Sequence, residues 1–258
     1  MRYEKIAEYI NTLADFYGKR DISFLNKEEL KNKYNINQAD IMVLFGGSII
    51  AGGDIFAQAI KEKIAKKYII VGGYGHTTDT LINNIKEIIP NINYKTEAEI
   101  FNEYIKNKYN AQADFLEIHS TNCGNNITNL LDIIKKEKLD FNNIILIQDS
   151  TMQLRMWAVI KKYIDENIEV INYASYKVKV INKDSKLIYN NYPLGMWNID
   201  RYINLLMGEI PRLTDNKEGY GPKGKDFLIH IDIPEEAEKA FLELKKYYLN
   251  MVREAKKN

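Results

Sequence analysis

The residues best suited to acid–base chemistry lie in short polar loops that follow apolar runs. The chain has three histidines and one cysteine, Cys123. Because histidine changes charge near neutral pH, we predict acid–base roles for His76 and His119. Glu117 and Asp149, each at the end of an apolar run, are the candidate catalytic carboxylates. No spacing among these residues matches a metal-ligand motif, so we predict no metal site.

Two of these loops begin with a pair of glycines. Glycine allows the backbone to approach a ligand closely, and the amides that begin the next helix attract anions. The first loop lacks the Lys-Ser/Thr of a P-loop, because Gly53-Asp54 stands there, and it is not a GxGxxG turn. The competing interpretation is a tight turn with Asp54 as the helix cap. The predicted ligand-binding residues of the two loops are Gly46, Gly47, Ser48, Gly72, Gly73, His76 and Thr77.

The densest polar run, 117–126, follows a third apolar run. Its predicted binding residues, Ser120, Asn122 and Asn126, offer neutral donors and acceptors that suit ribose hydroxyls, amides or an amino-acid group. After a fourth apolar run, Arg155 lies one turn into a predicted helix, where it can reach a carboxylate or a phosphate. The competing interpretation gives these residues structural roles. Asn125 or Asn126 would cap the next helix, and Arg155 would form a surface or structural salt bridge.

Hydrophobic patterning places these loops at the ends of strands. Apolar runs typical of buried strands alternate with segments of helical spacing, which predicts a parallel sheet covered on both faces. Ligands bind such sheets outside the carboxyl ends of the strands, which selects the four loops above. The fold class is therefore α/β, a Rossmann-like three-layer α/β/α sandwich. Strands are expected at 39–45, 68–71, 115–118, 143–147 and 168–173, and helices at 3–17, 27–30, 54–66, 80–89, 97–108, 125–138, 151–164 and 199–207.

We predict a single domain over 1–258. N-terminal helices occupy 1–36, the α/β core 37–174, and a hairpin with a C-terminal helical arm 175–258. Within the last part, 209–233 is expected to be a structured loop or arm, in which 219–225 with Arg212 either closes over an anionic ligand or packs, solvated, on the sheet domain. A terminal helix is expected at 235–256, and its apolar residues either pack on the core or mediate self-association.

Composition excludes several classes of partner. With 36 basic and 35 acidic side chains the formal charge is only +1, so we expect no nucleic-acid partner. The longest apolar runs are too short to span a bilayer, and the charged N-terminus is unlike a signal peptide. A single cysteine suits a reducing compartment. These features predict a cytoplasmic protein whose partner is a small molecule.

Taken together, the segments resemble the YdcF-like family, which also contains the SanA and ElyC envelope proteins. The resemblance implies a Rossmann-like core and S-adenosylmethionine as a ligand, and it brings no agreed catalytic residues. Because the envelope relatives carry a membrane anchor and we see none here, we do not expect an envelope role. The segments that carry the resemblance are 44–54, 75–78, 120–126, 148–153 with Arg155, 208–212, 219–224 and 230–234.

Three functions remain open at this point. The first is a protein that binds an adenosyl or nucleotide-like molecule such as S-adenosylmethionine, with or without transferase activity. Glu117 would then hold ribose hydroxyls and Arg155 the methionine carboxylate, although the first turn is not the GxGxG of common methyltransferases. The second is a hydrolase or transferase that acts on a phosphorylated or pyrophosphate substrate. The third is a ligand sensor without catalysis.

Overall fold

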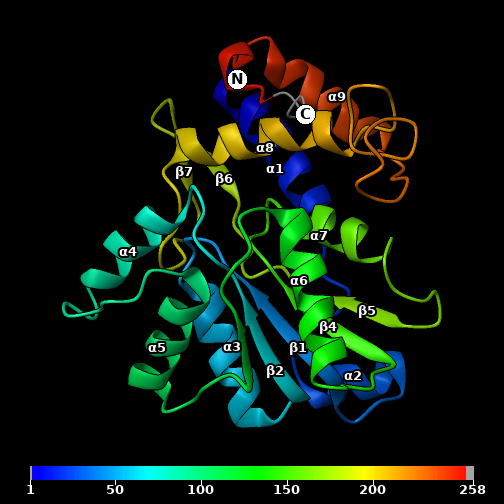
Figure 1. Cartoon of the computed structure of the whole chain (residues 1–258). Coiled ribbons are helices and arrows are strands. Elements are labelled where there is room, and N and C mark those ends of the chain that lie inside the picture. The colour runs from blue at the N-terminus through cyan, green and yellow to red at the C-terminus, as the bar shows by residue number, and fades with distance from the viewer. Residues whose placement is uncertain (1, 254–258) are drawn as a thin grey trace.

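The computed structural model describes residues 2–253 and shows a five-stranded parallel sheet with helices on both faces (Figure 1). The predicted Rossmann-like α/β/α class is confirmed. The strand order is β3-β2-β1-β4-β5. The strands are β1 (Ala39–Phe45), β2 (Ala65–Val71), β3 (Phe115–Glu117), β4 (Asn143–Ile147) and β5 (Glu169–Asn172).

The centre of the sheet consists of continuous apolar runs because both of its faces are covered. In β1, Val43 pairs with Ile69 of β2 on one side and with Leu146 of β4 on the other. Successive side chains of a strand point to opposite faces. Accordingly, Val43 joins the apolar cluster on one face and Leu44 the cluster on the other.

The helices are divided between the two faces of the sheet. Each helix covers the face whose apolar cluster its buried residues join. One face is covered by α2 (Lys27–Tyr34), α3 (Ala51–Glu62), α4 (Thr78–Lys86) and α5 (Glu97–Tyr109). The other is covered by α1 (Arg2–Tyr17), α6 (Cys123–Lys136) and α7 (Gln153–Ile160). The helix that follows β1 therefore lies on the opposite face from the helix that follows β4. Between these two neighbouring strands the strand order reverses, and this is the point where open α/β sheets bind ligands.

A further layer lies beyond the carboxyl ends of the strands (Figure 1). Here α1 packs against α8, α9 and β6. The apolar side of α9 faces the core, with Phe241 and Leu244 buried, whereas Leu242 is exposed. The elements of this layer are β6 (Val180–Lys183), β7 (Lys186–Tyr189), α8 (Ile199–Leu213), α9 (Glu235–Lys245) and the short 3-10 helix η1 (Leu249–Met251).

Several predicted boundaries are wrong. Helix α8 continues to Leu213, past Pro211, because Arg212 and Leu213 are buried there and tertiary packing outweighs the missing amide. The expected terminal helix ends at Lys245, and residues 254–256 of that prediction lie outside the described part of the chain. Strand β2 begins at Ala65, before the apolar run, because its first residues pair with β1.

Asp54 does not cap a helix, contrary to the alternative considered from the sequence. Helix α3 begins at Ala51, so Asp54 lies in its first turn. Its carboxylate accepts hydrogen bonds from the hydroxyls of Tyr104 and Tyr109 of α5 and pairs with Lys108. The carboxylate thus joins two neighbouring helices. Among the described residues, no helix combines the length and apolar character that a membrane span requires.

Gly73, at the end of β2, lets this loop touch the loop after β3. A Cβ at Gly73 would lie 2.3 Å from the carbonyl oxygen of Ser120 and 2.9 Å from the carbonyl oxygen of Ile118. We expect Gly73→Ala to lower the free energy of unfolding by about 1–3 kcal/mol, measured by urea denaturation, because backbone must move. The matched control is Gly75→Ala, whose Cβ would come no closer than 3.9 Å to Thr121. Equal losses in the two variants would contradict this packing argument.

Candidate functional site

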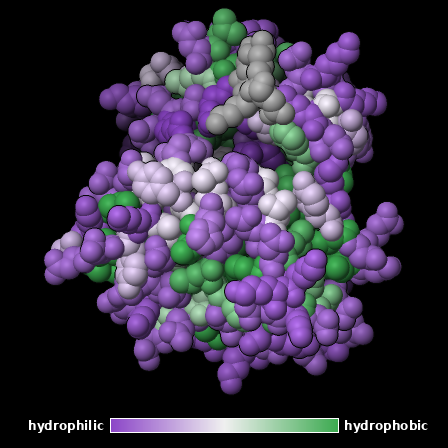
Figure 2. All heavy atoms as spheres, viewed as in Figure 1, coloured by the Kyte–Doolittle hydropathy of each residue, from purple (hydrophilic) through white to green (hydrophobic). Residues whose placement is uncertain are grey.

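A cavity of about 200 Å³ lies where the strand order reverses, between the carboxyl ends of the strands and α8. We call it the central cavity. The loops after β1, β2, β3 and β4 form one side, and residues of α8 with Trp197, Tyr220 and Arg253 form the other. In Figure 2 this face is hollowed below the upper helices, with hydrophilic side chains above the hollow and side chains of intermediate hydropathy along its lower edge. The four loops predicted from the strand ends therefore contribute residues to one shared cavity.

The structure brings most of the predicted site residues together. Three of them, Ser48, Glu117 and His119, are not among the residues that line the cavity. Ser48 is fully buried, and its hydroxyl has no hydrogen-bond partner among the described residues. The predicted residues that do line the cavity are Gly46, Gly47, Gly72, Gly73, His76, Thr77, Ser120, Asn122, Asn126, Asp149 and Arg155. Their roles stay predictions.

Glu97, which the sequence analysis missed, is the carboxylate between the two glycine loops. It begins α5, whose first amides donate to the carbonyls of Gly73 and Gly72 at 3.0 and 2.8 Å. A Cβ at Gly46 would lie 2.4 Å from Oε2 of Glu97. The glycine in the first loop is therefore required for this carboxylate to reach the cavity.

The environment of Glu97 favours its protonated form. Burial raises the pKa of this carboxyl group, and hydrogen bonds from the hydroxyls of Thr77 (2.7 Å) and Thr78 (2.9 Å) to Oε1 only partly oppose the shift. The Thr78 hydroxyl in turn accepts from the amide of Gly75. A carboxyl group with a raised pKa at the edge of a cavity is the usual form of a general acid–base residue.

Glu117 has a local structural role. Its carboxylate accepts hydrogen bonds from the amides of His119 (2.7 Å) and Ser120 (3.0 Å) and from the side chain of Asn129 (3.0 Å). These bonds close the turn after β3, in which His119 is exposed and is not among the residues that line the cavity. Asn122 then caps α6, with its side chain accepting from the amide of Asn125 at 3.0 Å.

Asp149 holds the turn after β4 and does not cap α7, which begins only at Gln153. Its Oδ1 accepts from the amide and hydroxyl of Thr151, both at 2.8 Å, and from the hydroxyl of Tyr176 at 2.7 Å. Its Oδ2 accepts from the indole of Trp197 at 2.9 Å. These donors orient a buried carboxylate on the cavity wall and join the core to the segment before α8.

The side-chain amide of Gln148, next to Asp149 in the chain, uses its oxygen in a hydrogen bond but not its nitrogen. Its Oε1 accepts from the amide of Asp149 at 2.6 Å. Its Nε2 is buried and has no hydrogen-bond partner among the described residues, although Gln148 lines the central cavity. Because an unpaired buried donor is costly, this amide is a natural partner for an acceptor on a bound molecule.

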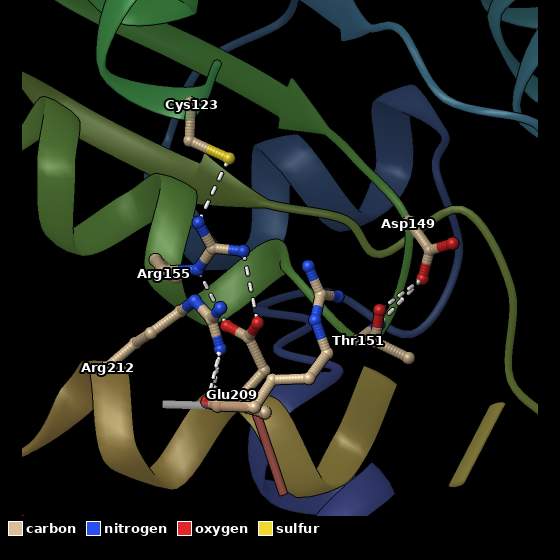
Figure 3. Close-up of polar contacts among 8 residues, drawn as sticks. Cys123, Asp149, Thr151, Arg155, Glu209 and Arg212 are labelled. Atoms are coloured by element: carbon tan, nitrogen blue, oxygen red, sulfur yellow. Dashed lines mark hydrogen bonds and ion pairs between the residues drawn. The ribbon is translucent and has the colours of Figure 1, made fainter. Parts of the chain in front are cut away.

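Arg155 joins three helices at the side of the cavity (Figure 3). Its Nε and Nη2 donate to the carboxylate of Glu209 at 2.7 and 3.0 Å, and its Nη1 donates to the sulfur of Cys123 at 3.0 Å. Burial alone would lower the pKa of the guanidinium, but the Cys123 sulfur and the Glu209 carboxylate raise it above its ordinary value. Arg155 is thus charged and largely engaged in a bidentate pair, as the structural alternative from the sequence expects.

Arg212 and Arg253 add positive charge to the same wall. The guanidinium of Arg212 donates to the carbonyl oxygens of Gly208 and, at 3.0 Å, of Arg253. Burial lowers the pKa of Arg253, and the nearby charges of Arg212 and Arg201 lower it further, while Glu209 partly compensates. The described charges that act on Arg253 are mostly positive, so an anionic group beside it would favour its charged form.

The missed residues come from distant parts of the chain. Glu97 follows a threonine cap and precedes Glu99 in a capping box, so its local pattern marks only a helix start. Glu209 lies in 208–212, one of the segments that carry the resemblance, but it is not among the predicted site residues, and no motif connects Arg253 to the site. Within residues 2–253, no group of histidine, cysteine and acidic side chains is arranged to hold a metal ion.

A comparison of the chain with models of known protein families finds no match. The similarity to the YdcF-like family consequently stays a prediction.

Removing Arg155 leaves Glu209 buried without its cationic partner. We expect Arg155→Met to lower the free energy of unfolding by about 3 kcal/mol or more in urea denaturation, because the exposed fractions of the two side chains are only 12% and 6%. The double variant Arg155→Met/Glu209→Leu should recover much of that loss. As a control, Lys5→Met breaks the exposed pair with Glu8 and should change stability by less than about 1 kcal/mol. Additive losses in the double variant would contradict a buried, coupled pair.

Proposed function

We propose that this protein binds a small molecule with an anionic group in the central cavity, and that an adenosyl or nucleotide-like compound such as S-adenosylmethionine is its ligand. The observation that carries the proposal is the arginine cluster beside the cavity. Arg155, Arg212 and Arg253 line it together with Glu209, which is paired with Arg155. Burial and the charges of Arg212 and Arg201 disfavour the charged form of Arg253, so a carboxylate or phosphate placed beside its guanidinium would stabilise that form.

The other polar groups of the cavity support a ligand with hydroxyl and amide functions. Glu97 can accept hydrogen bonds from hydroxyl groups, and Gln148 has a buried amide to donate. The carboxylate for ribose hydroxyls would then be Glu97 in place of Glu117, and Arg253 with Arg212 would take the methionine carboxylate in place of Arg155. If S-adenosylmethionine binds, it supplies a methyl group that can be transferred.

Size limits how such a ligand would sit. The cavity of about 200 Å³ is smaller than the roughly 300–1,000 Å³ of pockets that enclose drug-sized molecules. It therefore suits the polar end of an adenosyl compound, and the remainder would lie at the mouth, where the exposed His76 is found. The reducing compartment implied by a single cysteine supports a cytoplasmic location for this function.

Binding of S-adenosylmethionine should depend on Arg253, whereas the stability of the unliganded protein should not. We expect S-adenosylmethionine to raise the melting temperature saturably, with ATP and NAD as comparison ligands, because a molecule bound only to the native state stabilises it. Arg253→Gln should weaken this binding at least about tenfold, the effect of losing one charge-assisted contact. The unliganded variant should be no less stable than the wild type, since Arg253 is repelled by its neighbours.

The control is Arg2→Gln on α1, away from the cavity, which should bind as the wild type does. Release of a small molecule from freshly purified, denatured protein, identified by mass spectrometry, would name the ligand directly. Equal affinity in Arg253→Gln and the wild type would overturn the assignment of the anion site, and no binding of any adenosyl compound would overturn the ligand class.

A second candidate function is a hydrolase or transferase that acts on a phosphorylated or pyrophosphate substrate. The raised pKa of Glu97 favours it, because a protonated carboxyl group can donate a proton to a leaving oxygen. The arginines would hold the transferred group or the leaving phosphate. A binding protein without turnover has no need of such an acid, so turnover separates this candidate from the first.

For this candidate, activity should depend on the ionisation of Glu97. A panel of phosphate esters and pyrophosphate would be assayed for released phosphate as a function of pH. If Glu97 is the general acid, the rate falls as pH rises through a pKa above the ordinary value of 4.5. Glu97→Gln should abolish this dependence and lower kcat by about 100-fold or more, with substrate affinity retained. Glu62→Gln, on the exposed surface of α3, removes the same charge outside the cavity and is the matched control. Unchanged kcat in Glu97→Gln would exclude this role.

A further inference from the structure

A second and larger recess lies on the other side of the turn after β4. It has a volume of about 770 Å³ and runs between the end of α1, the segment before β6, and α8. We call it the lysine groove, because Lys19, Lys177 and Lys179 line it together with Arg20. None of the residues predicted from the sequence to bind a ligand lines this groove.

The charges of the groove are mostly uncompensated. Lys177 and Lys179 are exposed, and no carboxylate lies within ion-pair distance of either one in the part of the chain that the structure describes. Lys19 pairs with Asp21 at 2.9 Å. The only acidic residue among those lining the groove in residues 2–253 is Asp15. Several cations that share one recess with a single carboxylate attract anions strongly.

The floor of the groove adds hydroxyl groups that no protein atom uses. Ser150 is 5% exposed and Tyr202 is 1% exposed, and both line the groove. Neither hydroxyl makes a hydrogen bond to another described residue. Neither oxygen is among the fully buried side-chain atoms of the described residues that lack a partner, so both hydroxyls are open to the groove and can donate hydrogen bonds to a bound molecule.

We propose that the lysine groove binds a multiply charged phosphate compound of the size of a nucleoside diphosphate. Lys177 and Lys179 would contact the phosphate oxygens at the rim, while Ser150 and Tyr202 would donate hydrogen bonds from the floor. Lysine suits this role because its ammonium group is a compact charge with several donors on a flexible stem. The volume of about 770 Å³ leaves room for more than the phosphates alone.

This site is separate from the central cavity and does not depend on the proposed function. The two share only the turn after β4, in which Asp149 lines the central cavity and Ser150 lines the groove. Arg253 contributes to the cavity alone. Variants of Arg253 and variants of the two lysines therefore report on the two sites independently.

The experiment is isothermal titration calorimetry of the full chain with ADP and with tripolyphosphate at several salt concentrations. Both probes should bind, and their affinity should fall as salt rises, since the contacts are exposed charges. Lys177→Gln/Lys179→Gln should weaken binding at least about tenfold, and Ser150→Ala should weaken it less. The matched control is Lys183→Gln/Lys186→Gln, at the exposed tip of the same hairpin, which should change affinity less than about twofold.

Three results would overturn the proposal. Equal losses in the two double-lysine variants would show attraction by surface charge alone. A loss in Arg253→Gln with none in Lys177→Gln/Lys179→Gln would assign the phosphate compounds to the central cavity. Tighter binding of a single-stranded oligonucleotide than of ADP, with the same dependence on Lys177 and Lys179, would make the groove a nucleic-acid surface.

Discussion

The arrangement of the site depends on the ion pair between Arg155 and Glu209. Arg155 comes from the first turn of α7 at the sheet, and Glu209 from α8, which covers the strand ends. Burying both charges is favourable only while they stay paired with good geometry, and the bidentate contact at 2.7 and 3.0 Å provides that. The third contact, to Cys123 at the start of α6, joins another strand loop to the same point. Any shift of α8 would therefore break the most strongly desolvated charge pair on the cavity wall.

A second constraint acts on the opposite wall, where backbones approach closely. The absence of side chains at Gly46 and Gly72 allows α5 to dock its first turn on both loops and to bring Glu97 between them. The cavity is consequently bounded by a carboxyl group with a raised pKa on one wall and by guanidinium groups on the other. This polarity is what makes a ligand with an anionic end and hydroxyl or amide functions the best match to the site.

Much of the fold was predictable because its signals are local. The runs that became β1 and β4 are continuously apolar, which only a sheet covered on both faces accommodates. Errors occurred where distant contacts outweighed local patterns. Helix α8 passes Pro211 because its last turn is buried, and the expected terminal helix stops at Lys245.

The sequence by itself determined the class of fold and the edge of the sheet where a site forms, because strand–helix alternation brings the carboxyl ends of parallel strands together. It did not determine which side chains face the cavity. Glu117, directly after a strand, turns to its own backbone amides, whereas Glu97 arrives on a separate helix through glycine contacts. Arg253 and Glu209 reach the site only because α1, α8 and α9 pack beyond the strand ends. Such placements depend on long-range packing, and no spacing within the chain encodes them.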